Sequence, residues 1–233
     1  MSNKSLGCIA AAMVAAAGAA ESQAAWISAS GSGYAPVGYG SDATAEFRNL
    51  RSHPATFEIG LKHAGQSGYA ATGHAIWVQG VNTITITYDT AANQATFALN
   101  GVAQSIVVAE DPRSIGIHLQ AQNSGSLDAS LALQSVTLNG DAVDLSGASG
   151  YLAASWSNGA GDPMGNTHLI LTDPTFASSS WTLSAQVAAD WSGAAPNNSN
   201  TRVDMTFTQI PTPSAASIGT CALALVALRR GRR

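Results

Sequence analysis

Histidine, carboxylate and thiol side chains are the residues of this sequence that could perform acid–base, metal or nucleophilic chemistry. The five histidines never fall in a metal-binding spacing such as His-Glu-x-x-His. His118 lies between Ile117 and Leu119, and this alternation predicts a strand histidine that faces solvent rather than a ligand or a base. The sequence has no Gly-x-Ser-x-Gly nucleophile elbow, and both cysteines lie near the chain ends. We therefore expect a noncatalytic protein that needs no cofactor.

The acidic residues concentrate in turns, where two arrangements offer several oxygens. Asp141 and Asp144 follow a tight Asn-Gly turn, and Asp162 and Asp173 bracket a loop rich in glycine, proline and asparagine. Such loops bind Ca²⁺ when several ligands converge, so these four are weak calcium candidates, although EF-hand spacing is absent and capping of turns is the simpler interpretation. A secreted glycoside hydrolase is the least favoured alternative, because the sequence has no catalytic motif and its acidic residues mostly lie in turns. Spacing does not exclude it, since the paired carboxylates of such an enzyme come from distant strands.

Tryptophans are the residues best suited to bind a sugar, because a flat indole face can stack on a sugar ring. Trp156 and Trp191 adjoin the polar loops 157–162 and 192–200, which makes them the candidates for glycan binding. Both also occupy strand positions where a core or half-buried tryptophan is ordinary, and that packing is the simpler interpretation.

The elements that would position these residues are strands. Thr and Ile alternate strictly from Thr83 to Tyr88, and Asn100-Gly101 favours a tight hairpin turn. We also expect strands at 75–78, 114–122, 129–138 and 181–191, with roughly a dozen in all. The chain is therefore predicted to be all-β, with residues 26–210 forming a single β-sandwich or jelly-roll-like domain.

The composition of residues 26–210 limits the partners of this domain. Five basic residues stand against thirteen acidic ones, so the domain carries a net charge of −8 and lacks the basic surface that a nucleic acid requires. Neither cysteine falls within it, so burial and strand pairing must hold it together without a disulfide.

The amino-terminal residues 1–25 have the features of a secretory signal peptide. Lys4 precedes an apolar stretch from Leu6 to Ala20, and small residues allow cleavage after Ala24 or Ala25. The chain is therefore expected to be exported.

The carboxy-terminal residues 211–233 have three parts with separate physical meanings. Pro211-Thr212-Pro213 ends the preceding strand, and a run of about 14 small and apolar residues can enter a bilayer, although about 20 span one comfortably. The basic cluster stays with anionic headgroups on the cytoplasmic side. This cluster consists of Arg229, Arg230, Arg232 and Arg233.

This tail resembles the PEP-CTERM sorting signal of bacteria that produce exopolysaccharide, with Pro-Thr-Pro in place of the usual Pro-Glu-Pro. The resemblance implies processing by an exosortase-type enzyme, at least transient anchoring in the membrane through the C-terminal segment, and delivery to the cell surface or extracellular matrix. Pro211 and Pro213 with the four arginines would form the sorting signal.

A second resemblance covers most of 47–209. A Phe-Glu-Ile-Gly strand at 57–60 is followed by Trp77, a Leu-Gln-Ser-Val-Thr-Leu-Asn-Gly strand at 133–140 and a late strand from Trp181. This order is similar to the choice-of-anchor ectodomains, in particular the group labelled W, which have no assigned activity. We therefore expect a noncatalytic surface or matrix protein associated with exopolysaccharide, with a carbohydrate-binding module as the alternative.

Overall fold

The computed structural model describes residues 25–29, 40–48, 57–63, 66–109, 112–122, 127–157, 165–196 and 201–209. Within these ranges the chain consists of strands, turns and two short 3₁₀ helices, η1 (Ser146–Ala148) and η2 (Pro174–Ala177). No helix in them has the length and apolar character that a membrane crossing needs. The predicted tail and all of the predicted signal peptide except Ala25 lie outside the described residues. The prediction of an all-β fold is confirmed for the part of the chain that is described.

Seven antiparallel strands form the first sheet, which we call sheet A, in the order β1, β12, β8, β14, β2, β3, β4. Their bounds are β1 (Ala25–Ala29), β2 (Gly40–Arg48), β3 (Ile59–His63), β4 (Ala71–Gly73), β8 (Ser114–Ala121), β12 (Gly165–Thr172) and β14 (Arg202–Gln209).

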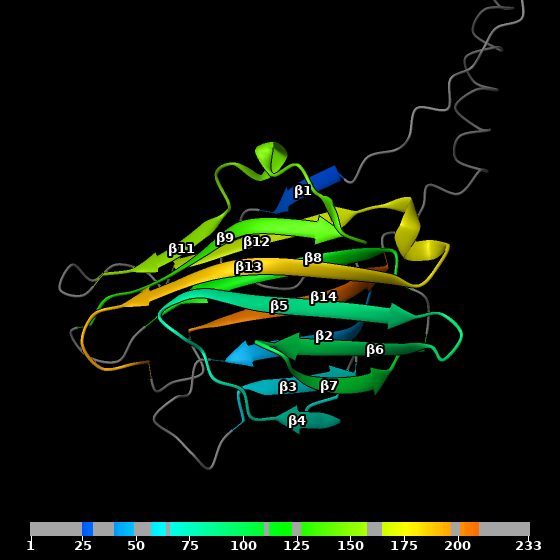
Figure 1. The fold of residues 1–233 in the computed structure, drawn as a ribbon, viewed down its shortest axis with the longest axis horizontal. Helices are drawn as coiled ribbons and strands as arrows, with labels where there is room; N and C mark the ends of the chain where they lie inside the picture. Colours follow the sequence, from blue (N-terminus) through cyan, green and yellow to red (C-terminus); the bar gives the residue numbers. More distant parts are fainter. Residues whose placement is uncertain are drawn as a thin grey trace, which may run out of the picture.

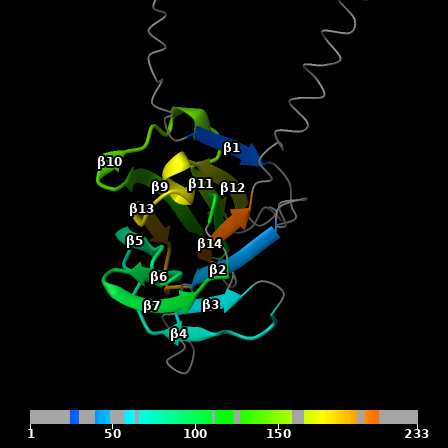
Figure 2. The same cartoon turned by 90° about the vertical axis from the view of Figure 1, so that its right-hand side faces the viewer.

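Seven further strands form sheet B, in the order β10, β9, β13, β5, β6, β7, with β11 beside β9. Their bounds are β5 (Gly80–Asp89), β6 (Gln94–Leu99), β7 (Val102–Val107), β9 (Ala129–Leu138), β10 (Asp141–Ala142), β11 (Ala153–Trp156) and β13 (Trp181–Trp191). The two sheets form layers that face each other, as a β-sandwich requires, with sheet B in front in Figure 1 and the layers side by side in Figure 2.

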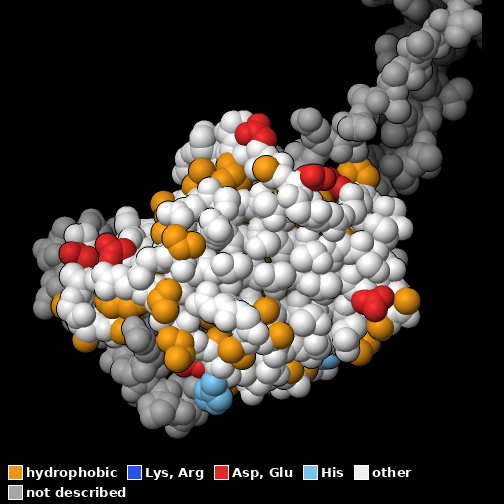
Figure 3. Space-filling model, viewed as in Figure 1, with side chains coloured by type: hydrophobic (Ala, Val, Ile, Leu, Met, Phe, Trp, Pro, Cys, Tyr) orange, Lys and Arg blue, Asp and Glu red, His pale blue; other side chains and the backbone are white. Residues whose placement is uncertain are grey.

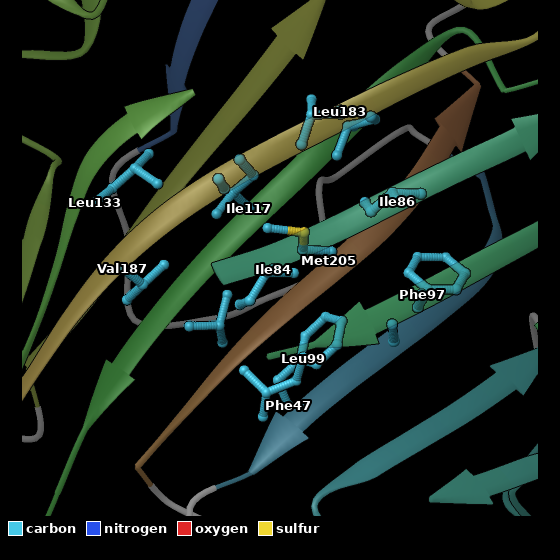
Figure 4. Close-up of a cluster of buried hydrophobic side chains, with 14 of the residues drawn as sticks. Phe47, Ile84, Ile86, Phe97, Leu99, Ile117, Leu133, Leu183, Val187 and Met205 are labelled. Carbon is cyan, nitrogen blue, oxygen red and sulfur yellow. The ribbon is translucent and has the colours of Figure 1, made fainter. Parts of the chain in front are cut away.

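The core lies between the sheets and follows directly from the alternation in the sequence. Ile84, Ile86 and Tyr88 of β5 are fully buried, while the threonines between them face outward. They meet apolar side chains of sheet A such as Phe47 and Met205, which are also fully buried (Figure 4). Since neither cysteine lies in the described residues, this packing and the strand ladders carry the fold of that part.

Two hairpins form as the sequence predicts. Asn100 and Gly101 have φ values of 49° and 87°, and Asn139 and Gly140 have values of 54° and 92°. Positive φ at both central residues is the geometry of the tight turn that Asn-Gly favours.

The predicted strand at 75–78 is wrong. Trp77 is buried there, with 1% of its surface exposed, but the segment pairs with no strand. Its backbone is held by side-chain amides, because Asn82 bonds both the N–H and the C=O of Val78, and Asn100 donates to the carbonyl of Ile76. An asparagine can supply the donor and acceptor that a neighbouring strand would otherwise provide.

Candidate functional site

The two candidate tryptophans lie in one row at one end of sheet B. Ala129, the first residue of β9, is paired with Trp156 of β11 on one side and with Trp191 of β13 on the other. Direct cross-strand neighbours project from the same face of a sheet, so both indoles lie on the core-facing side with Ala129. Trp191 is 8% exposed there, and Trp156 is half-buried. The indole N–H of Trp156 is buried and has no hydrogen-bond partner among the described residues. The register of three strands thus brings together two tryptophans that are 35 positions apart in the printed sequence.

A surface hollow of about 360 Å³ opens beside these tryptophans, and its rim is polar. Gln79 donates from Nε2 to Asp190 Oδ1 at 2.5 Å and to the carbonyl of Trp191 at 3.1 Å. On the other side, the Ser157 hydroxyl donates to Asp128 Oδ1 at 3.2 Å. The remaining rim contributes serines from β9, β11 and the loop after β13. A concave site with an aromatic side and a few convergent polar groups is the usual form of a small-ligand or sugar site.

A second constellation, which we call the polar row, crosses the outward face of sheet A. His168, His118, Asp204 and Glu46 are direct cross-strand neighbours on β12, β8, β14 and β2. Outward positions of a sheet in a two-layer fold normally face water, yet the exposed fractions of His118 and Asp204 are both 3%, and that of Glu46 is 9%. The prediction that His118 faces solvent is therefore wrong. Alternation identified the face on which His118 lies but not that His118 is buried there.

The two histidines of the polar row stack on each other, with ring centroids 4.3 Å apart and planes inclined by 5°. His118 Nδ1 lies 2.9 Å from Asp204 Oδ2, and its Nε2 lies 3.1 Å from Asn166 Oδ1. A carboxylate only accepts hydrogen bonds, so Nδ1 of His118 carries a proton. Burial and then the charge of the stacked His118 lower the pKa of His168 to about 4, which keeps His168 neutral at pH 7.

The other half of the polar row is a network around Glu46. Lys62 Nζ and the Tyr69 hydroxyl each donate to this carboxylate at 2.6 Å. Burial raises the pKa of Glu46, but these hydrogen bonds and the charge of Lys62 outweigh it and hold the pKa below its usual value. Glu46 is therefore ionised at neutral pH, which is the opposite of what a general acid for glycoside hydrolysis needs.

Phe57 packs on the outward face beside this network, where its ring meets that of Tyr69. A side chain on Gly60 would meet the rings of Phe57 and Tyr69, so glycine lets both rings lie on the strand. Arg48 lies over the Phe57 ring, 4.3 Å from its centroid. β3 begins only at Ile59, so the alternation of that strand does not determine the side on which Phe57 lies.

Asp204 is the most constrained carboxylate of the polar row. Arg202 Nε lies 3.0 Å from the same Oδ2 atom that His118 faces. Oδ1 is buried without a hydrogen-bond partner among the described residues. The described part of the chain contains no group of three or more His, Cys, Asp or Glu side chains that could hold a metal ion.

The three calcium candidates that the structure describes do not form a group that could hold a metal ion. Asp144 accepts from the backbone N–H and hydroxyl of Ser146, and these bonds lower the pKa of Asp144. Asp173 caps η2 by accepting from the N–H of Thr175 at 2.8 Å. Asp141 is exposed in β10, and Asp162 lies outside the described residues. The sorting-signal residues also lie outside them.

Sequence reasoning missed Asp128 and Asp190 of the hollow and all charged members of the polar row except His118. The available signal was weak, since Glu46 and Asp204 occupy outward positions of alternating strands, where a charged side chain ordinarily faces water. No model of a known protein family matches this sequence, and comparison with curated proteins finds no significant match. Function has to be inferred from the two constellations themselves.

Proposed function

We propose that this chain is an exported, noncatalytic protein of the cell surface or extracellular matrix, whose domain binds polysaccharide through the hollow beside Trp156 and Trp191. The observation that carries the proposal is the meeting of two tryptophans with carboxylate, amide and hydroxyl groups in one hollow of about 360 Å³. A sugar ring has an apolar face that suits an indole and a rim of hydroxyls that suits such polar groups.

The ends of the sequence support the cellular location. A signal peptide at 1–25 delivers the chain across the membrane, and the jelly-roll-like domain at 26–210 follows. The PEP-CTERM-like tail at 211–233 engages an exosortase-type enzyme and anchors the protein at least transiently. A protein delivered by this route is expected to meet exopolysaccharide, which is the ligand class that the hollow fits.

Tryptophan fluorescence of the folded protein during titration with the host's purified exopolysaccharide tests the binding. We expect Trp156→Ala to weaken binding by about 1 to 3 kcal/mol, since stacking and area are lost together. Ile76→Ala is the matched control, because Ile76 is 63% exposed and lies outside the hollow. Equal affinities for the native protein and a folded Trp156→Ala variant would refute the role of the hollow.

Mass spectrometry of the C-terminal peptide recovered from the host tests the sorting route separately. A chain that ends near Pro213 is expected in the matrix. An intact chain that ends at Arg233 in the membrane fraction would make the tail a simple anchor and exclude processing.

A further inference from the structure

The hollow beside Trp156 and Trp191 is acidic, and this restricts the sugars that it can take. Asp128 and Asp190 both line it, and its other lining residues are alanine, glutamine, serine and tryptophan. No lysine, arginine or histidine is among the described residues of the rim. The electrostatic character of the site therefore comes from two carboxylates.

The two carboxylates are anchored where a bound sugar would meet them. Asp190 Oδ1 accepts from Gln79 and, at 3.0 Å, from the backbone N–H of Trp191, which fixes the carboxylate at the rim of the hollow. Asp190 is cross-strand to Ser130, two residues after Asp128, so both acidic residues come from the same corner of sheet B. Ser157, directly after Trp156, bonds Asp128. Asp190 therefore directly precedes Trp191, and Asp128 is bonded to the residue that follows Trp156.

Cations that could neutralise this corner lie elsewhere among the described residues. Lys62 is bonded to Glu46, Arg202 pairs with Asp204, and Arg48 lies over Phe57, all on the outward face of sheet A. Ala121, the last residue of β8, is paired with Gly165, which packs on Ser155 of the rim. Arg113 directly precedes the first residue of β8 and therefore lies at the other end of that strand from the hollow. Figure 3 shows acidic side chains on the face of sheet B and, among the residues that the structure describes, no lysine or arginine.

We propose that the hollow selects a cationic polysaccharide whose sugars carry free amino groups, over N-acetylated and uronic-acid polymers. This inference rests on the proposed glycan-binding function. A protonated amino group on the sugar donates to Asp190 or Asp128, while the apolar ring face lies against Trp156 and the hydroxyls bond the serines. A uronic acid would place its carboxylate against the two aspartates and be repelled.

Calorimetry with three defined hexasaccharides tests this selectivity: glucosamine, N-acetylglucosamine and galacturonic acid. The full folded chain is used with EDTA, which removes any calcium bridge, at a pH of about 5.5 and low salt so that the amines are charged and screening is weak. We expect the glucosamine hexamer to bind about tenfold more tightly than the N-acetylated one, and the galacturonate hexamer more weakly than both. Added salt should reduce the first ratio.

Asp190→Asn and Asp141→Asn separate the local charge from the net charge of the protein. Asp190→Asn keeps the acceptor atom and should bring the glucosamine to N-acetylglucosamine affinity ratio toward one. Asp141→Asn removes the same charge at the opposite end of β9, where Asp141 is paired with Leu138, and should leave the ratio unchanged.

The outcomes distinguish this inference from the proposed function. Equal binding of the amino and N-acetylated hexamers, or tighter binding of galacturonate, would overturn the selectivity while the glycan-binding function stands. If Asp190→Asn left the ratio unchanged, the selectivity would not come from this hollow. Binding of none of the three, together with no binding to the host polysaccharide, would overturn both.

Discussion

The outward faces of the two sheets differ in charge and in exposure. Sheet A presents the polar row, in which His118, Asp204 and Glu46 are at most 9% exposed. Figure 3 shows few charged side chains over sheet B. Thr83 and Thr87 of β5 are exposed to solvent on this face. The two sheets have seven strands each and share one core, so the difference lies in what each outward face must satisfy.

This comparison shows that the alternation of apolar and polar residues in a strand does not distinguish an exposed outward face from a buried one. An exposed hydroxyl bonds water when its protein partner is removed, so substitutions on sheet B should be nearly neutral. A buried charge has lost its water and depends on its partners, so removing one member of the polar row leaves the others uncompensated. Stability measurements on the two faces should therefore differ strongly.

The largest expected effect is the loss of Asp204. Asp204→Ala leaves His118 and Arg202 without their shared carboxylate and should lower the free energy of unfolding by about 3 to 5 kcal/mol. Urea unfolding followed by tryptophan fluorescence measures it. Asp204→Asn keeps an oxygen acceptor and is expected to unfold at a lower urea concentration than the native protein. This variant provides the measurement if the alanine variant does not fold.

Asp141→Ala is the matched control, because it removes the same charge from an exposed strand of sheet B. Its effect should stay within about 0.5 kcal/mol. If the two alanine variants lost similar stability, the burial of the polar row would not be what stabilises the fold.

An intermediate effect is expected from acid, and it should belong to sheet A. The unfolded chain protonates His168 near pH 6.5, whereas burial and the charge of His118 keep the pKa in the fold at about 4. Between these values the unfolded state binds more protons, so stability falls as the pH drops from about 6.5 to 4. Glu46 adds to this at lower pH, because its pKa is lowered in the fold and its contribution disappears as it is protonated.

His168→Gln tests the source of this acid sensitivity. The variant should lose part of the slope of unfolding free energy against pH in this window, whereas His74→Gln, at an exposed histidine outside the stacked pair, should keep it. A slope that is the same in the native protein and in His168→Gln would contradict the assignment.

The sequence predicted the strands well and their environment poorly. The bounds of β9 and β13 match the predicted 129–138 and 181–191, because period-two burial is written into those residues. The polar row could not be found in this way, since its members come from four strands and only the pairing registers make them neighbours. Trp156 and Trp191 were candidates because of their flanking loops, but their meeting across Ala129 depends on the register of β11 and β13.

The smallest expected effects come from one substitution, Thr→Val, made on the outward face of each sheet. Thr44 and Thr206 form a hydroxyl pair at 3.3 Å on sheet A, and Thr87 and Thr182 form one at 3.4 Å on sheet B. Thr→Val preserves shape and β-branching while removing the hydroxyl, so the two variants differ mainly in the burial of the partner.

Thr44→Val should lower the free energy of unfolding by about 1 kcal/mol, because Thr206 is only 1% exposed. Thr87→Val should change it by less than about 0.5 kcal/mol, since water replaces the lost bond and valine suits a strand equally well. Thermal and urea unfolding of both variants measure the difference. Equal losses would mean that burial on the outward face of sheet A has no energetic consequence, and the contrast between the two faces would then be one of composition alone.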